Sequence, residues 1–245
     1  MFQTKSCVRS WGFKGGRSGV ITVDWVAALL RDGLVQKLFT ILGKGQHELQ
    51  QTECGYRTVI YCRPGSTANI ETPFVGEAIV RLFPELVDEI HILGTQQAMW
   101  NQILRHAMVD FDDWNSMDAA TQDWLQACDL AVKDGQTCPD MQRLAGELSL
   151  FLERPTFCHI IPMGLDQEEL AEIACTLDSL VQAGDMVHLD ITHGLRFQPL
   201  IIRKTLGKII RTKGAQTGET FYGALELPEA RSAFRPLLRL ASVLR

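Results

Sequence analysis

The sequence lacks the features that would place the protein in a membrane or outside the cell. No run of apolar residues reaches the roughly 18 that a transmembrane helix needs. The N-terminus has no basic start followed by an apolar centre and a small-residue cleavage site, so it does not indicate a signal peptide. The seven cysteines are an odd number without a C-x-x-C pair, which predicts reduced thiols rather than a disulfide framework. We therefore expect a cytoplasmic protein with no membrane partner.

Motifs for bound metals and common nucleotides are also missing. The acidic residues between 110 and 118 lack the spacing of a calcium loop, so we interpret them as a solvated face and expect no metal and no cofactor. Neither G-x-x-x-x-G-K-[ST] nor G-x-G-x-x-G is present, since the second pattern fails at Glu48. The net charge of −5 argues against binding of duplex nucleic acid. A local basic pocket for a small polyanion stays compatible with that charge.

The sequence does contain an alternation of short apolar strands and longer helical patterns. The predicted strands are 34–42, 56–62, 89–93, 156–161, 186–191 and 218–225. Strands alternating with helices predict an α/β domain with a mostly parallel sheet and helices on both faces, here with a helical insertion around 108–154. We expect this domain to span 34–245. Residues 1–33, which include several glycines and basic residues, are interpreted as an N-terminal extension of undefined structure.

Local chemistry predicts several helix boundaries. Thr72 and Thr95 are each expected to be the N-cap of a helix, because a hydroxyl can accept a hydrogen bond from the first turn. Asp166 is expected to start a helix with an acidic first turn. Pro199 fits the first turn of the helix after the strand at 186–191. A last helix is predicted from Arg235 to Leu244.

Polar residues with anion-binding chemistry follow two of the predicted strands. Ligands of open parallel sheets bind beyond the carboxyl ends of the strands. Gly43, Lys44 and Gly45 offer backbone N–H groups and an ammonium group after the first strand. The stretch 189–196 offers a hydroxyl, an imidazole, a glycine N–H and a guanidinium, and these groups are Thr192, His193, Gly194 and Arg196. The alternative interpretation is a tight turn whose polar groups only cap the following helix.

These motifs, in their order along the chain, are similar to those of the CARF domain. This is the CRISPR-associated Rossmann-fold sensor of type III immunity, and the resemblance is to its Csx1/Csm6-like branch. It covers roughly residues 34–240 and rests on L-G-K-G (42–45), E-T-P-F-V-G-E-A (71–78), I-L-G-T (92–95), I-I-P-M-G (160–164), L-D-I-T-H-G-L-R (189–196) with Pro199, and Y-G-A (222–224). The pattern D-I-T-H-G-x-R-x-x-P is the most specific of these elements.

The resemblance implies a Rossmann-like homodimer that binds a cyclic oligoadenylate second messenger across its two-fold axis. Four adenylates suit a two-fold dimer, so cyclic tetra-adenylate is the expected ring. The resemblance places the ligand at residues 43–45 and 192–196, with Thr95 beside them. Phe197, Gln198 and Gln46 are candidates to stack on adenine or bind its edges. Family members usually continue into an effector such as a ribonuclease, so a fused or separate effector is an expected partner.

Three functions follow as hypotheses. The first is a sensor domain that binds the messenger and changes the shape of its dimer. The second is a ring nuclease, in which a ribose 2′-OH attacks the neighbouring phosphate without a metal while Lys44, His193 and Arg196 orient the groups and stabilise charge. The third is a nicotinamide-dependent oxidoreductase, which the missing glycine motif disfavours. We expect the sensor and keep the ring nuclease as the alternative.

Overall fold

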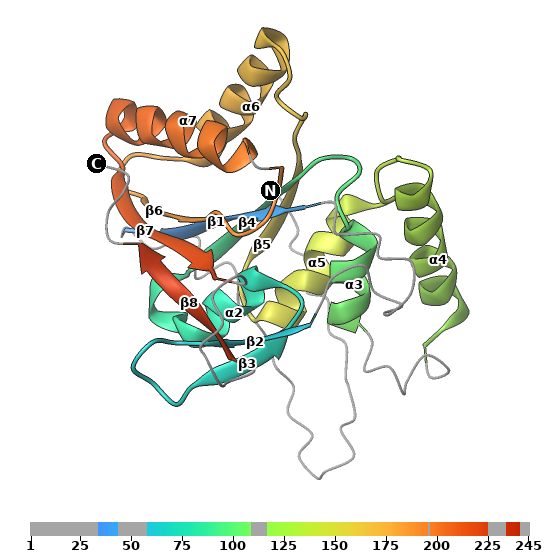
Figure 1. Ribbon diagram of the computed structural model, residues 1–245. Helices are drawn as coiled ribbons and strands as arrows, with labels where there is room; N and C mark the ends of the chain where they lie inside the picture. Colours follow the sequence, from blue (N-terminus) through green and yellow to red (C-terminus); the bar gives the residue numbers. More distant parts are fainter. Residues whose placement is uncertain (1–33, 44–57, 109–116, 196, 225–233, 241–245) are drawn as a thin grey trace, which may run out of the picture. The chain divides into compact units, whose positions relative to one another are not determined.

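The computed structural model describes residues 34–43, 58–108, 117–195, 197–224 and 234–240. They form one eight-stranded sheet in the order β3-β2-β8-β7-β6-β1-β4-β5 (Figure 1). The strands are β1 (Gln36–Leu42), β2 (Val59–Cys62), β3 (Asn69–Thr72), β4 (Glu89–Gly94), β5 (Thr156–Ile160), β6 (Met186–Asp190), β7 (Gln216–Gly223) and β8 (Phe234–Leu240). The run β7-β6-β1-β4-β5 is entirely parallel, while β8 is antiparallel to β7 and β3 is antiparallel to β2. The predicted mostly parallel sheet is therefore confirmed.

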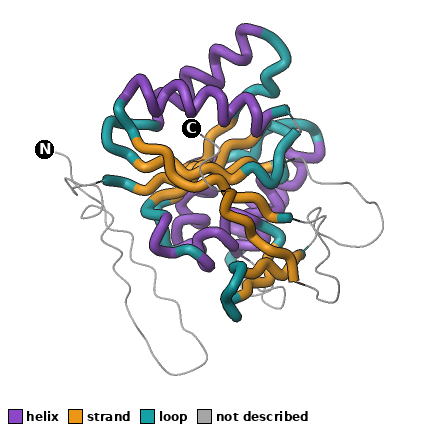
Figure 2. Tube along the Cα trace, turned by 60° about the vertical axis from the view of Figure 1, so that its left-hand side comes forward, coloured by secondary structure: helices purple, strands orange, loops and turns teal. Residues whose placement is uncertain are grey.

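Helices cover both faces of this sheet (Figure 2). One face carries α2 (Val75–Leu82), α3 (Trp100–Met108), α4 (Ala119–Lys133) and α5 (Met141–Leu152), and the other carries α6 (Gln167–Leu180) and α7 (Gln198–Lys213). A short 3-10 helix spans Pro84–Leu86. The helices α3, α4 and α5 all lie between β4 and β5, so the predicted helical insertion is also confirmed. The arrangement is an α/β, Rossmann-like fold.

Strand β1 shows why the central strands are apolar along their whole length. Leu38 and Leu42 are buried in the core beneath α2 and α3, whereas Phe39 and Ile41 are buried in the core beneath α6 and α7. Alternate side chains of a strand point to opposite faces, so a strand covered on both faces needs apolar residues at every position. This explains the continuous apolar run in the sequence, and it places the end of β1 in the middle of the sheet.

Two strands differ from the sequence prediction. The predicted helix from Arg235 to Leu244 is wrong, because 234–240 form β8, which pairs with β7 on one side and with β2 on the other. Its backbone groups are satisfied by neighbouring strands; for example, the Pro236 carbonyl accepts the N–H of Ala224, at the end of β7, at 3.1 Å. Strand β3, not predicted at all, returns after a turn at 63–66 to form a hairpin with β2.

Two helix starts agree with the prediction. Asp166 is the N-cap of α6, and its carboxylate accepts the Glu169 N–H at 2.8 Å. Pro199 lies in the first turn of α7, where its missing N–H has no carbonyl to bond.

The two threonine caps are wrong. The N-cap of α2 is Phe74, and the Thr72 hydroxyl instead accepts the Phe74 N–H in a local turn at 3.0 Å. Helix α3 begins only at Trp100, and Thr95 contributes its carbonyl, which accepts the Ala98 N–H and the indole N–H of Trp100. An extra turn after β4 therefore separates Thr95 from the helix.

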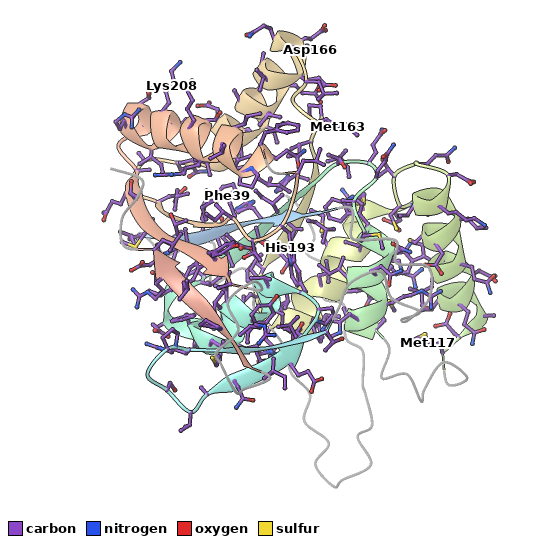
Figure 3. The ribbon with its side chains drawn as sticks, viewed as in Figure 1. Phe39, Met117, Met163, Asp166, His193 and Lys208 are labelled. Atoms are coloured by element: carbon purple, nitrogen blue, oxygen red, sulfur yellow. The ribbon has the colours of Figure 1, made fainter. Side chains whose placement is uncertain are left out.

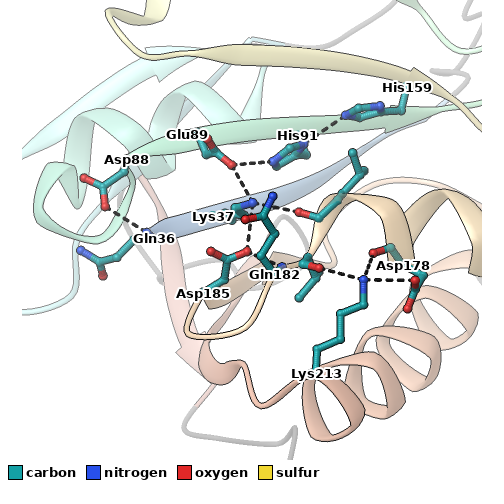
Figure 4. Close-up of polar contacts among 12 residues, drawn as sticks. Gln36, Lys37, Asp88, Glu89, His91, His159, Asp178, Gln182, Asp185 and Lys213 are labelled. Carbon is teal, nitrogen blue, oxygen red and sulfur yellow. Dashed lines mark hydrogen bonds and ion pairs between the residues drawn. The ribbon is translucent and has the colours of Figure 1, made fainter. Parts of the chain in front are cut away.

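A buried charged cluster joins the strands beneath α6 (Figure 4). The Lys37 ammonium lies 3.1 Å from Glu89 and 2.9 Å from Asp185. His91 bridges Glu89 and His159, with nitrogen-to-acceptor distances of 3.1 and 3.0 Å. Burial opposes the ionisation of Glu89, but the hydrogen bond from His91 and the charge of Lys37 outweigh it and lower the pKa of Glu89. The cluster fixes β1 and β4 at the end of the sheet opposite the candidate site.

The predicted extension at 1–33 lies outside the described residues.

Candidate functional site

The candidate site lies where the sheet changes direction of winding. Counted outward from β1, the sheet continues with β4 and β5 on one side and with β6 and β7 on the other. The helices after β4 and β6 lie on opposite faces of the sheet. The carboxyl ends of β1 and β6 therefore border the crevice in which open α/β sheets bind ligands. Gly43 follows β1 there, and Thr192 and His193 follow β6 (Figure 3).

A buried carboxylate organises this edge. Asp190 is fully buried at the end of β6 and accepts three hydrogen bonds. They come from the Thr40 hydroxyl on β1 at 2.7 Å, the Thr192 N–H at 2.9 Å and the Thr192 hydroxyl at 2.5 Å. The Thr192 hydroxyl in turn accepts the Gly223 N–H at 2.8 Å, which ties β7 to the same network. A buried carboxylate needs such donors, and here they fix the start of the turn after β6.

The Asp190 carboxylate also affects its neighbour Tyr61. Tyr61 is buried on β2, and burial together with the charge of Asp190 raises its pKa well above the usual range. The phenol therefore stays neutral at every physiological pH.

The turn itself depends on a glycine. Gly194 has φ of +100°, a conformation that residues with a side chain rarely adopt. A Cβ at this position would lie 2.7 Å from Cγ2 of Ile41 on β1, closer than such atoms come in real proteins. The glycine therefore lets the turn after β6 lie directly against the end of β1.

Gln198 holds the far end of this turn. Its side chain is buried, its Oε1 accepts the Leu195 N–H at 3.1 Å, and its Nε2 lies 3.5 Å from the Met163 carbonyl. One amide thus links the turn after β6 to the segment after β5. This gives Gln198 a structural role and removes it from the side chains available to stack on or read an adenine.

His193 lies in the middle of the turn. Burial lowers its pKa, and the nearby Asp190 charge offsets only part of the effect, so the imidazole is neutral near pH 7. A neutral imidazole can donate one hydrogen bond and accept another.

The remaining predicted site residues divide into two groups. Gly43 and Thr95 lie at the same edge, because Leu42 pairs with Gly94 in the register of β1 and β4, and the Gly43 carbonyl accepts the Met99 N–H at 3.1 Å. Lys44, Gly45 and Arg196 lie outside the described residues, and so does Gln46. The ligand contacts of all eight predicted site residues stay predictions.

The sequence analysis missed Thr40 at this edge, and it included Asp190 and Gly223 only within motifs of the resemblance, without a role for either. A threonine inside an otherwise apolar buried strand was the available signal for Thr40, since a buried hydroxyl needs a partner. Asp190 at the end of a strand carried the same signal. Gly223 belongs to the Y-G-A motif (222–224), but its contact with Thr192 depends on the pairing of β6 and β7 and has no local signal.

Four exposed apolar side chains near this edge of the sheet form a group that we call the apolar rim. Leu195, Phe197 and Leu200 follow the turn and begin α7, with exposed fractions of 40%, 36% and 65%. Leu165, in the segment after β5, is 70% exposed. Gln198, which bonds the Met163 carbonyl, links the segment of Leu165 to this turn. Other large apolar side chains are exposed elsewhere on the fold, namely Leu34, Leu130, Leu150 and Phe157. Exposed apolar residues grouped beside a polar turn are typical of interaction sites.

Neither a metal centre nor a membrane span is found in the described part of the chain. No group of three or more His, Cys, Asp or Glu side chains there is arranged to hold a metal ion. No helix among the described residues has both the length and the apolar character needed to cross a bilayer.

Comparison with known proteins adds one relative. No known family model matches the chain. The chain is similar to CRISPR-associated protein MJ1674 of Methanocaldococcus jannaschii. The two are 23% identical over 207 residues, which cover 79% of this chain and 32% of the relative, so the chain spans about a third of the length of the curated protein it matches. This similarity supports a relationship to CRISPR-associated proteins.

Proposed function

We propose that this chain is a ligand-sensing domain of a CRISPR-associated protein and that it binds a cyclic oligoadenylate, cyclic tetra-adenylate in the first instance. The observation that carries the proposal is the placement of the D-I-T-H-G turn. This turn lies against the end of β1, where Gly43 starts the next predicted site segment. Both segments therefore border one crevice at the carboxyl edge of a parallel sheet.

The chemistry of this edge suits a ring of phosphates. Backbone N–H groups near glycines approach an anion closely because no Cβ blocks them. Lys44 and Arg196 would supply the positive charge that balances the phosphates, and the neutral His193 would donate a hydrogen bond. Phe197, partly exposed beside the turn, is the aromatic surface available for an adenine.

The proposal includes a homodimer. One crevice can hold only part of a four-fold ring, whereas two copies related by a two-fold axis would present each loop twice. The exposed apolar rim of Leu165, Leu195, Phe197 and Leu200 borders the crevice, so a second copy placed over it would cover apolar surface and both binding loops together.

The test is a binding titration with labelled cyclic tetra-adenylate, cyclic hexa-adenylate and linear tetra-adenylate. We expect the cyclic tetramer to bind most tightly, at one ring per two chains. Arg196→Ala should weaken its binding at least about tenfold, because a charge-assisted contact of about 1.5–3 kcal/mol is lost in each of two subunits. Lys133→Ala, an exposed lysine at the end of α4, is the matched control and should bind normally. Equal binding of all three ligands, or a monomer with and without the ring, would contradict the proposal.

Ring cleavage is the second candidate, because His193 lies in the turn at this edge and its imidazole is neutral at pH 7. An imidazole that is neutral at pH 7 can accept the proton of a ribose 2′-OH as that oxygen attacks the adjacent phosphorus and the 5′-oxygen leaves. The products would be linear adenylates ending in 2′,3′-cyclic phosphate, formed equally well in EDTA. His193→Ala and Lys44→Ala should then reduce cleavage more than binding. If the ring stays intact over hours at high protein concentration, the ring-cleavage hypothesis fails and ligand sensing is the proposed function that stands.

A further inference from the structure

The outer surface of α7 carries a stripe of aromatic, apolar and basic side chains, which are Phe197, Leu200, Lys204, Lys208 and Arg211. At 100° per residue in an α-helix, these five positions fall within about 80° of arc, so they form one line along the helix. All five side chains are exposed. Lys208 points away from the sheet (Figure 3). From first to last, the stripe is about 21 Å long at 1.5 Å per residue.

The three cations of the stripe have no partner among the described residues. Neither Lys204, Lys208 nor Arg211 forms a side-chain hydrogen bond or ion pair with any residue that the structure describes. Lys213, at the end of the same helix, shows the contrast: its ammonium lies 3.1 Å from Asp178 and also bonds the Val181 carbonyl at 3.0 Å. No described acidic group therefore neutralises these three positive charges, and they are available to bind a partner.

The charge is concentrated and bounded. Helix α7 has no acidic residue, although the chain as a whole has a net charge of −5. The adjacent helix α6 exposes Glu168 and Glu172, which would repel an anion. An anionic partner would thus contact α7 in preference to α6.

We propose that this stripe binds the backbone of a single-stranded nucleic acid. Lys204 and Lys208 are one helical turn apart, about 6 Å along the axis, which is close to the spacing of successive phosphates in an extended strand. Phe197, at the beginning of the line, offers the aromatic face on which a base can stack, and aromatic side chains beside a basic path are the usual features of such surfaces. A single strand is favoured over a duplex, because its unpaired bases are free to stack on an aromatic side chain. The stripe shares Phe197 and Leu200 with the rim of the proposed ring site, but its three cations lie farther along α7, so the inference does not depend on cyclic oligoadenylate binding.

The salt dependence of binding tests this directly. The full chain is titrated against a fluorescent 12-nucleotide uridine RNA and against the matching thymidine DNA between 50 and 200 mM salt. Three phosphate contacts predict a slope of log affinity against log salt of about −2, because single strands give about −0.7 per phosphate. Affinity should therefore fall roughly 20-fold over this fourfold range of salt. Equal binding of RNA and DNA assigns recognition to the phosphates alone, and preference for RNA adds the 2′-OH; both outcomes support the proposal.

Three variants separate the contributions. The double variant with Lys204→Glu and Lys208→Glu should reduce the magnitude of the salt slope to about 0.7 or less, and it should weaken binding at 50 mM salt more than tenfold. Phe197→Leu should weaken binding several-fold and leave the slope unchanged, because stacking does not release counterions. Lys133→Glu is the control, with the same change of charge at the exposed end of α4. If Lys133→Glu weakens binding as much as a stripe variant, or if the chain binds anionic phospholipid vesicles through Lys204 and Lys208 but neither oligonucleotide, the proposal is overturned.

Discussion

Replacing Gly194 with alanine tests how the D-I-T-H-G turn meets β1. Two costs add in this variant. A side chain at φ of +100° costs about 1–2 kcal/mol, because the new Cβ crowds the backbone. The same Cβ would lie 2.7 Å from Cγ2 of Ile41, and relieving such an overlap costs about 1–3 kcal/mol more. The variant should therefore lose about 2–5 kcal/mol of unfolding free energy.

Gly184→Ala isolates the second cost. Gly184 has φ of +86°, similar to that of Gly194, but a Cβ there would meet no atom within 4 Å. The Gly184→Ala variant should lose only the contribution from the backbone conformation, about 1–2 kcal/mol of unfolding free energy. Urea unfolding of both variants and the wild type gives the comparison, and the Gly194 variant should unfold at a urea concentration about 1 M below that of the Gly184 variant.

The outcome decides whether the close approach is real. If both variants lose the same free energy, the turn does not press on β1, and the placement of the site that depends on this contact fails. Adding Ile41→Ala provides a second check: if Gly194→Ala is relieved by space at Ile41, the two substitutions together should cost less than the sum of their separate effects.

Three further predictions concern the same edge and the sheet. Asp190→Ala should cost about 3 kcal/mol or more of unfolding free energy, because it leaves buried donors without an acceptor, while Thr40→Val, which removes one hydroxyl, should cost about 1–2 kcal/mol; chemical denaturation compares them. Gln198→Ala should speed hydrogen exchange of the Leu195 amide and cost about 1–2 kcal/mol, whereas an unchanged exchange rate would contradict its role in the turn. Burial lowers the pKa of His188 from its ordinary 6.5 to about 4. The unfolded chain therefore binds more protons between these values, so stability falls by at most about 3 kcal/mol as the pH drops from 6.5 to 4, and His188→Gln should flatten that part of the pH profile.

The strands could be predicted from the sequence wherever burial on both faces of the sheet requires a continuous run of apolar residues. Strands β1, β4 and β6 were predicted close to their observed ends for this reason, and the edge at which their loops meet followed from parallel pairing. Strand β8 could not be found in the same way. Residues 234–240 combine apolar and basic residues in a pattern that also fits a helix, and only pairing with the preceding strand β7 and the distant strand β2 decides the outcome.

The candidate site could be predicted from the sequence only in outline. A histidine, a glycine and a threonine after a strand indicated the turn, but its internal contacts depend on residues from other strands. The Thr40 hydroxyl reaches Asp190 across 150 positions of sequence, and Gly223 reaches Thr192 across 31. Gln198 shows the limit most clearly: as an isolated amide it fitted base recognition equally well, and only its burial beside Met163 gives it a structural role.

The contacts at this edge constrain how a ligand there could act. The turn after β6 is held to β1 through Thr40 and Asp190, to β7 through Gly223 and to the segment after β5 through Gln198. A turn fixed in its binding conformation loses little entropy when a ligand binds, so most of the interaction energy stays available as affinity. It also has little freedom to refold around the ligand. In a dimer of the proposed kind, a ring bound across the axis would therefore act mainly by drawing the two rigid edges together or turning one against the other, a movement that packed subunits transmit well.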